Sequence, residues 1–84
     1  MNKIEIIGIS KIGEKVIFDV IFIGETLLVG SVYSNTELEL KIKILGIGFV
    51  HAPYNEKSLL VEILAADTYD ISDFKNAVLE LVPS

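Results

Sequence analysis

The sequence contains no cysteine, no tryptophan and no arginine among its 84 residues. Without cysteine, a disulfide scaffold, a cysteine-ligated metal site and a cysteine nucleophile are all excluded. The seven basic residues are all lysines, and twelve acidic residues give a formal net charge of −5. Nucleic-acid binding usually needs a basic face, often rich in arginine, so this composition disfavours DNA and RNA and favours a basic protein partner.

The motifs that mark enzymes and cofactor sites are also missing. His51 is the only histidine, the glycines do not form a phosphate-binding loop, and no Gly-x-Ser-x-Gly turn is present. Asp67, Asp70 and Asp73 lack the ligand spacing and the central glycine of a calcium loop, and Asp70 is instead placed to cap a short helix. We therefore expect no enzymatic activity, no bound nucleotide, no metal and no other cofactor.

Long hydrophobic runs are absent as well. The most apolar window, Val16 to Ile23, is interrupted by Asp19 and is far shorter than the roughly 20 residues that span a bilayer. No apolar core of a signal peptide follows Met1. We therefore expect a cytoplasmic protein that does not enter a membrane.

The sequence does contain short stretches rich in Ile and Val, residues that favour strands over helices. Turn residues separate these stretches at close spacing, which is typical of a small barrel. The alternation of polar and apolar residues shifts by one position at Ile6 and Ile7, beside Gly8, and this shift predicts a bulge. Gly46 and Gly48 predict a sharp bend. The prediction is a single all-β domain over residues 1–84, an antiparallel barrel of six or seven strands. The expected strands are 3–11, 15–23, 26–29, 32–33, 37–49, 58–65 and 77–82, with at most one short helix within 67–76.

One stretch is apolar on both of its faces. In the strand expected at 15–23, Phe18 and its alternate neighbours take one face, and the other face carries three isoleucines broken only by Asp19. A barrel of this size has one interior, so the outer face needs a cover. The cover is either a second molecule or this chain's own short helix and ends. The candidate interface is Ile17, Ile21, Ile23 and Leu60, and the candidate loop contact is His51 with Tyr54, which otherwise are ordinary loop residues.

The order of these segments resembles the second domain of translational GTPases, the β-barrel of elongation factor Tu and its relatives. The resemblance lies in Ile23–Val32, which reads IGETLLVGSV, in Leu59–Leu64, which reads LLVEIL, and in the later pairs Asp70-Ile71 and Val78-Leu79. It covers nearly the whole chain and implies a stand-alone barrel of that kind. The GTPase domain itself has no counterpart here, so the resemblance implies no nucleotide hydrolysis.

Together these features predict a non-catalytic protein-binding or assembly module, either self-associated or held by another protein. A second interpretation is an acidic immunity or antitoxin protein that neutralises a basic partner. A third is a translation-associated accessory domain, which the missing arginine disfavours. A small molecule in the mouth of the barrel stays open at this point, because a sequence does not show whether a barrel mouth is open.

Overall fold

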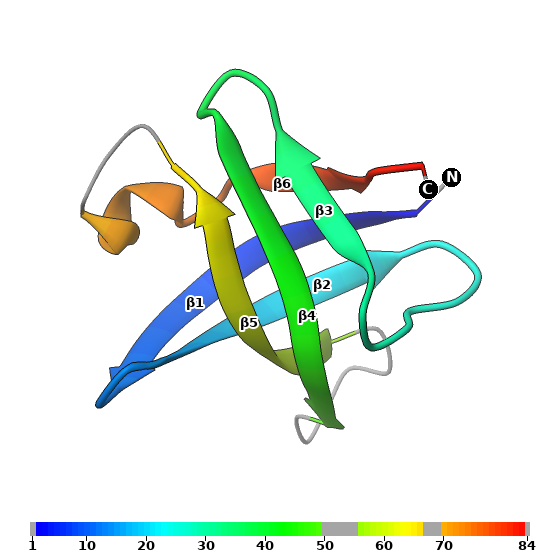
Figure 1. The fold of residues 1–84 in the computed structure, drawn as a ribbon. Coiled ribbons are helices and arrows are strands. Elements are labelled where there is room, and N and C mark those ends of the chain that lie inside the picture. The colour runs from blue at the N-terminus through cyan, green and yellow to red at the C-terminus, as the bar shows by residue number, and fades with distance from the viewer. Residues whose placement is uncertain (1, 50–55, 67–69, 84) are drawn as a thin grey trace.

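The computed structural model describes residues 2–49, 56–66 and 70–83 and folds them into a closed antiparallel barrel (Figure 1). Around the barrel the strands follow the order β1-β2-β5-β4-β3-β6, and every pairing is antiparallel. The all-β prediction is confirmed, with six strands and a single 3-10 turn in the described part of the chain. The elements are β1 (Lys3–Ile12), β2 (Lys15–Ile23), β3 (Val32–Asn35), β4 (Leu40–Phe49), β5 (Glu56–Ala65), η1 (Ile71–Phe74) and β6 (Val78–Leu81).

β1 and β2 form a long hairpin whose register changes once. The pairing is regular from Lys3 to Ile6, skips Ile7, and resumes at Gly8 opposite Asp19. This is the predicted bulge, and it lets both Ile6 and Ile9 face the interior although they are three residues apart. β2 has the predicted bounds, and Phe18 and Val20 are fully buried between partly exposed neighbours.

β4 also changes register, between Ile44 and Gly46. Before this point Leu40, Ile42 and Ile44 face the core, and after it Ile47 packs against the same core. Gly46 lies opposite Leu60, and Gly48 lies opposite Ser58. The phase change read from the sequence is therefore a bulge at Leu45 within one continuous strand.

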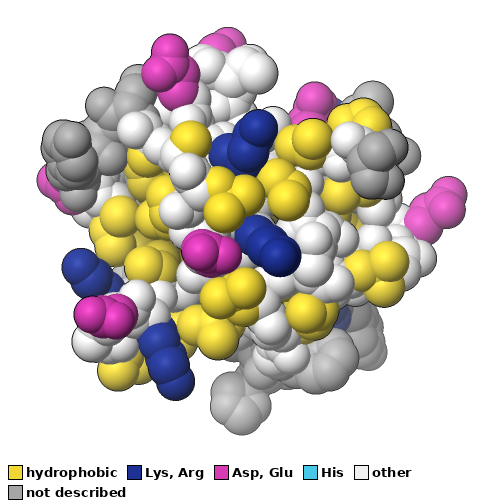
Figure 2. Space-filling model, in the orientation of Figure 1, with side chains coloured by type: hydrophobic (Ala, Val, Ile, Leu, Met, Phe, Trp, Pro, Cys, Tyr) yellow, Lys and Arg dark blue, Asp and Glu magenta, His cyan; other side chains and the backbone are white. Residues whose placement is uncertain are grey.

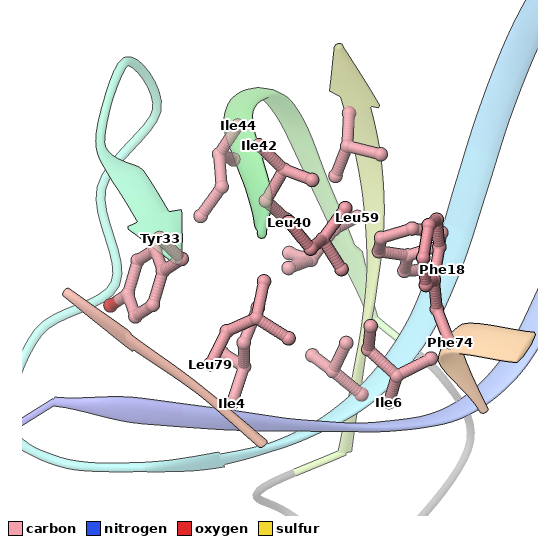
Figure 3. Packing of buried hydrophobic residues seen from close by; sticks show 12 residues of the cluster. Ile4, Ile6, Phe18, Tyr33, Leu40, Ile42, Ile44, Leu59, Phe74 and Leu79 are labelled. Carbon is pink, nitrogen blue, oxygen red and sulfur yellow. The ribbon is translucent and has the colours of Figure 1, made fainter. Parts of the chain in front are cut away.

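The interior of the barrel is a single apolar cluster supplied by all six strands and by η1 (Figure 3). Among the described residues it includes no buried charged side chain. Its members are Ile4, Ile6, Phe18, Val20, Tyr33, Leu40, Ile42, Ile44, Leu59, Val61, Phe74 and Leu79. Because this cluster uses the inward positions of the strands, the apolar residues at outward positions need a separate explanation.

Two local predictions are wrong. Residues 26–29 do not form a strand, and residues 37–39 belong to a turn, so β4 begins only at Leu40. In that turn Glu39 takes a positive φ of 50°, and the Asn35 side chain accepts a hydrogen bond from the backbone N–H of Leu38 at 3.0 Å. A regular alternation of polar and apolar residues therefore continues through a turn, where Leu38 still packs against the core.

Of the helix expected within 67–76, residues 67–69 lie outside the described residues, and residues 70–76 form only the 3-10 turn η1. Asp70 caps it, since its Oδ1 accepts hydrogen bonds from the backbone N–H of Ser72 at 3.0 Å and from the Ser72 hydroxyl at 2.6 Å. η1 lies against β1 and places Phe74 in the core. The short helical piece thus contributes its large apolar side chain to the interior of the barrel.

Candidate functional site

The predicted interface residues lie on the outside of the barrel, on β2 and β5. Ile17 and Leu60 are direct cross-strand partners, and both are partly exposed. The row continues on either side, from Ile17 to Ser10 on β1 and from Leu60 to Gly46 on β4. Two aliphatic side chains therefore lie at the centre of a four-strand row whose ends are small. We call the outward surface of Ile17, Ile21, Ile23 and Leu60 the β2–β5 face.

The next row along the sheet is made of small residues except for one carboxylate. Gly8 pairs with Asp19, Asp19 with Ser58, and Ser58 with Gly48. A Cβ atom added at Gly8 would lie 3.2 Å from the Asp19 Oδ2, so this glycine leaves room for the carboxylate. Because the residues at both ends of this row have small side chains or none, another backbone could approach the sheet closely there.

Acidic residues flank the remaining part of the β2–β5 face. Ile21 pairs with Glu5 on one side and with Glu56 on the other, and Asp19 lies between Ile17 and Ile21 on the same strand. Ile23 ends β2 opposite Lys3 and is 54% exposed. The structure thus brings Ile17 and Leu60 into contact range and separates them from Ile21 by a row that carries a negative charge.

The other chemically notable residues do not form a site in the described part of the chain. His51 and Tyr54 lie outside the described residues, as does Asp67. The pKa of Asp70 is lowered, first by the Ser72 hydroxyl and then by the Ser72 backbone N–H, which is the behaviour of a capping carboxylate. Among residues 2–49, 56–66 and 70–83 no group of three acidic or imidazole side chains could hold a metal ion. Nor does that part of the chain form a helix that is both long and apolar enough to cross a membrane.

A second apolar surface lies next to the loop between β2 and β3, and sequence reasoning did not find it. Leu28 and Val29 are each 60% exposed, and they line a groove of about 810 Å³ together with Leu64 and Leu81, which are 46% and 38% exposed. Lys41 also lines this groove. We call these five residues the loop groove. In Figure 2 the side formed by β3, β4 and β5 faces the viewer, and hydrophobic side chains lie around lysine and acidic side chains on it.

The sequence signal for the loop groove is the run Leu27-Leu28-Val29 between Gly24 and Gly30. The sequence predicts a strand for that run, and a strand would bury alternate residues. In the structure only Leu27 packs against the core. Because the sequence predicts a strand where the structure has a loop, it does not reveal that Leu28 and Val29 are both exposed.

Asn2 holds this loop against the start of the chain. Its side-chain amide donates to the Thr26 carbonyl at 2.8 Å and accepts from the Glu25 backbone N–H at 3.2 Å. Gly24 has a φ of 151°, and a Cβ atom there would collide with the Asn2 side chain. The conformation that exposes Leu28 and Val29 is thus fixed by a specific close contact.

Tyr33 is the one buried side chain with an unsatisfied polar atom among the described residues. Its ring is fully buried in the core, and its hydroxyl has no hydrogen-bond partner of standard geometry. Burial raises the pKa of the Tyr33 phenol, and the Asn2 side chain has a smaller effect in the opposite direction. Tyr33 does not line the loop groove.

No protein-family model, no curated protein and no solved structure matches this chain. The features of the described chain that bear on function are its two apolar surfaces, the charges beside them and the barrel that positions them.

Proposed function

We propose that this chain is a non-catalytic binding module that docks another protein surface on its β2–β5 face. The observation that carries the proposal is the pairing of Ile17 with Leu60 on the outside of a barrel whose interior is already filled. Outward strand positions that face water are usually polar, and an apolar cluster there commonly marks a contact surface. The lack of side chains at Gly8, Gly46 and Gly48 supports this, because it leaves the cluster accessible to a second surface.

The acidic residues around Ile21 favour a partner with basic groups. Glu5, Asp19 and Glu56 flank the apolar side chains, and the whole chain carries a net charge of −5. Charge complementarity of this kind speeds association and rejects partners of like charge. The same observation supports the second candidate function, an immunity or antitoxin protein that covers a basic protein. In that case binding weakens steeply with added salt, whereas an interface dominated by Ile17 and Leu60 persists.

The six-stranded barrel and the residue pattern of Ile23–Val32 support a relationship to the second domain of translational GTPases. We propose this relationship for the barrel alone. A role as a translation accessory would require contact with RNA, which the absence of arginine disfavours. The cytoplasmic location expected from the sequence stays a prediction, which cell fractionation would test.

Hydroxyl-radical footprinting tests the proposed surface without knowledge of the partner. The protein is labelled in concentrated extract of its own cells and, separately, as a dilute purified sample. Ile17, Ile21 and Leu60 are expected to be less oxidised in the extract. Val78 is the internal control, because it is 43% exposed on β6, which is not adjacent to β2 in the barrel. Equal oxidation of the three residues in both samples would contradict the proposal.

A further inference from the structure

The loop groove is held in shape by hydrogen bonds to the barrel. Its walls are the loop before β3, the outer side of β4 and the ends of β5 and β6, and Figure 1 shows that loop at the same end of the barrel as the end of β6. The Gly30 N–H donates to the Ile44 carbonyl at 2.7 Å, and the Val82 N–H donates to the Val32 carbonyl at 2.8 Å. The side chain of Asn2 fastens the same loop to the start of the chain. A preformed groove of this kind loses little conformational freedom when a partner binds.

The side chains that line the loop groove are mainly aliphatic. Half of the exposed large hydrophobic residues of the described chain line it, namely Leu28, Val29, Leu64 and Leu81. Its volume of about 810 Å³ is of the size that holds drug-sized molecules, which is room for several aliphatic side chains. Covering these residues removes apolar surface from water, which favours binding. The matching occupant is therefore apolar over most of the surface that enters the groove.

The one charged side chain that lines the loop groove is a lysine. Lys41 lies on the exposed side of β4 at the edge of the groove. Its partners across the sheet are Ser34 on β3 and Ala65 on β5, and neither carries a charge. Lys41 forms no ion pair with any described residue. Its ammonium group is therefore available to an anionic group of a partner.

The carboxylates nearest to Lys41 along the two neighbouring strands lie outside the groove. Glu62 is the cross-strand partner of Lys43, the next outward residue on β4. Glu39 lines a smaller hollow beside Lys41, in the turn before β4, and forms no ion pair with it. Neither glutamate lines the loop groove. Within the groove itself, a carboxylate is thus the group that complements the charge of Lys41.

Aliphatic groups joined to a carboxylate could come from a free fatty acid or from a polypeptide. The interior of the barrel is filled by its own core, so the groove contacts a ligand from the outer surface only. Sites for small molecules usually bury most of the ligand, whereas a fatty acid here would leave much of its chain in water. The aliphatic side chains of a polypeptide are covered on their other side by the polypeptide itself. The geometry therefore favours a polypeptide.

We infer that the loop groove binds a segment of a partner protein in which aliphatic side chains lie next to an aspartate or a glutamate. The four aliphatic residues of the groove contact the aliphatic side chains of the segment, and Lys41 pairs with its carboxylate. This inference goes beyond the proposed function, because it assigns a second surface and does not depend on the first. Both surfaces include a residue of β5, Leu60 in one and Leu64 in the other, so the experiment must tell them apart.

Peptide selection on two forms of the protein tests the chemistry of the partner. A phage-displayed library of random peptides selected on the wild type is expected to be enriched in aliphatic residues beside Asp or Glu. The same library selected on Lys41→Glu should be enriched in aliphatic residues beside Lys or Arg, because the charge in the groove is reversed. Val78→Ser, which alters an exposed residue outside the groove, should select the same peptides as the wild type. No enrichment on the wild type, or the same acidic peptides on the wild type and Lys41→Glu, would overturn the inference.

NMR titration with the most enriched wild-type peptide locates its binding site. The methyl signals expected to shift are those of Leu28, Val29, Leu64 and Leu81. Lys41→Glu and Leu28→Ser are each expected to weaken binding about tenfold or more, whereas the double variant Ile17→Ser, Leu60→Ser should bind like the wild type. Circular dichroism checks that each variant keeps the barrel, and Val29→Ser replaces Leu28→Ser should that variant fail to fold. Loss of binding in the double variant, with the groove variants unaffected, would place the peptide on the β2–β5 face and overturn the inference.

Sodium decanoate is the probe for a free fatty acid in the same titration. It is expected to bind more weakly than the selected peptide, and tighter saturable binding of decanoate in the groove would overturn the assignment to a polypeptide. The footprinting of Ile17 and Leu60 in cell extract tests the β2–β5 face separately. Failure of the loop groove to bind peptides therefore leaves the proposed function standing, and failure of the footprinting leaves the groove inference standing.

Discussion

Ile17 of β2 and Leu60 of β5 face each other across two paired strands on the outside of the barrel. Phe18, the next residue along β2, pairs with Leu59 and points into the core, where both are fully buried. One residue step along the strand therefore separates a surface position from an interior one. We therefore expect substitutions of Phe18 and of Ile17 to change the free energy of unfolding by different amounts.

Phe18→Ala is expected to lower the free energy of unfolding by about 3–5 kcal/mol, because it leaves a cavity in the core. Ile17→Ser should cost about 1 kcal/mol or less, since it removes only part of a cross-strand contact on the surface. Urea denaturation of the purified variants at low concentration measures both values. Comparable losses for the two variants would show that the outer face of β2 is part of the folding core.

Gly24→Ala is expected to destabilise the protein by about 1–3 kcal/mol. The position has a φ of 151°, and the new Cβ atom would collide with the Asn2 side chain. The matched control is Gly46→Ala, where a Cβ atom would meet Leu60 at an ordinary contact distance of 3.6 Å and should change stability by no more than about 0.5 kcal/mol. Thermal denaturation of both variants makes the comparison. An unchanged Gly24→Ala variant would mean that Asn2 does not fix the loop in this position.

Tyr33→Phe is expected to keep or raise stability, by up to about 2 kcal/mol, because it removes a buried hydroxyl that has no hydrogen-bond partner of standard geometry. The pKa of Tyr33 is raised by burial above its ordinary value of 10.0. As the pH rises above this value, the unfolded chain ionises first and the folded state loses stability. Denaturation curves at neutral pH and at alkaline pH should show an alkaline loss in the wild type that the variant lacks, once the losses common to both are subtracted. An identical alkaline loss in both would contradict the burial of this hydroxyl.

Ser72→Ala is expected to raise the pKa of Asp70 toward its ordinary value of 3.8, because the Ser72 hydroxyl is the main cause of its lowering. The pKa should stay below that value, since the backbone N–H of residue 72 still donates to the carboxylate. A lowered folded-state pKa means that the contribution of Asp70 to stability is present above the ordinary value and is lost as the pH falls through the folded-state value. Carbon-13 NMR titration of the aspartate carboxyl groups measures this shift. A pKa that is the same with and without the hydroxyl would show that the Ser72 hydroxyl does not donate to Asp70 in solution.

The parts of the fold that were predictable are those in which side-chain alternation decides the structure. The alternation around Phe18 and Val20 correctly gave the bounds and the inner face of β2. The slip at Ile7 correctly gave a bulge, because only an extra residue lets Ile6 and Ile9 share one face. The outward position of Ile17 followed from the same reasoning.

The parts that failed depend on contacts made far along the chain. The alternation of residues 37–39 fits a strand, but Asn35 bonds the backbone of Leu38 and donates to the Val78 carbonyl at 3.0 Å, which fixes a turn there. The run that includes Leu28 and Val29 fits a strand equally well, but Asn2 holds it as a loop. The loop groove could not be predicted for the same reason, since it unites this loop with Leu64 and Leu81 from distant strands.

Native mass spectrometry of the protein recovered from its own cells tests the β2–β5 face most directly. The comparison is between the wild type, the Ile17→Ser, Leu60→Ser double variant and the Val78→Ser control, each expressed at the natural level. The wild type and the control should be recovered in a complex heavier than one chain, and the double variant as a single chain. A wild type recovered only as a single chain, or a double variant recovered in the same complex as the wild type, would show that the outer apolar pair does not hold a partner.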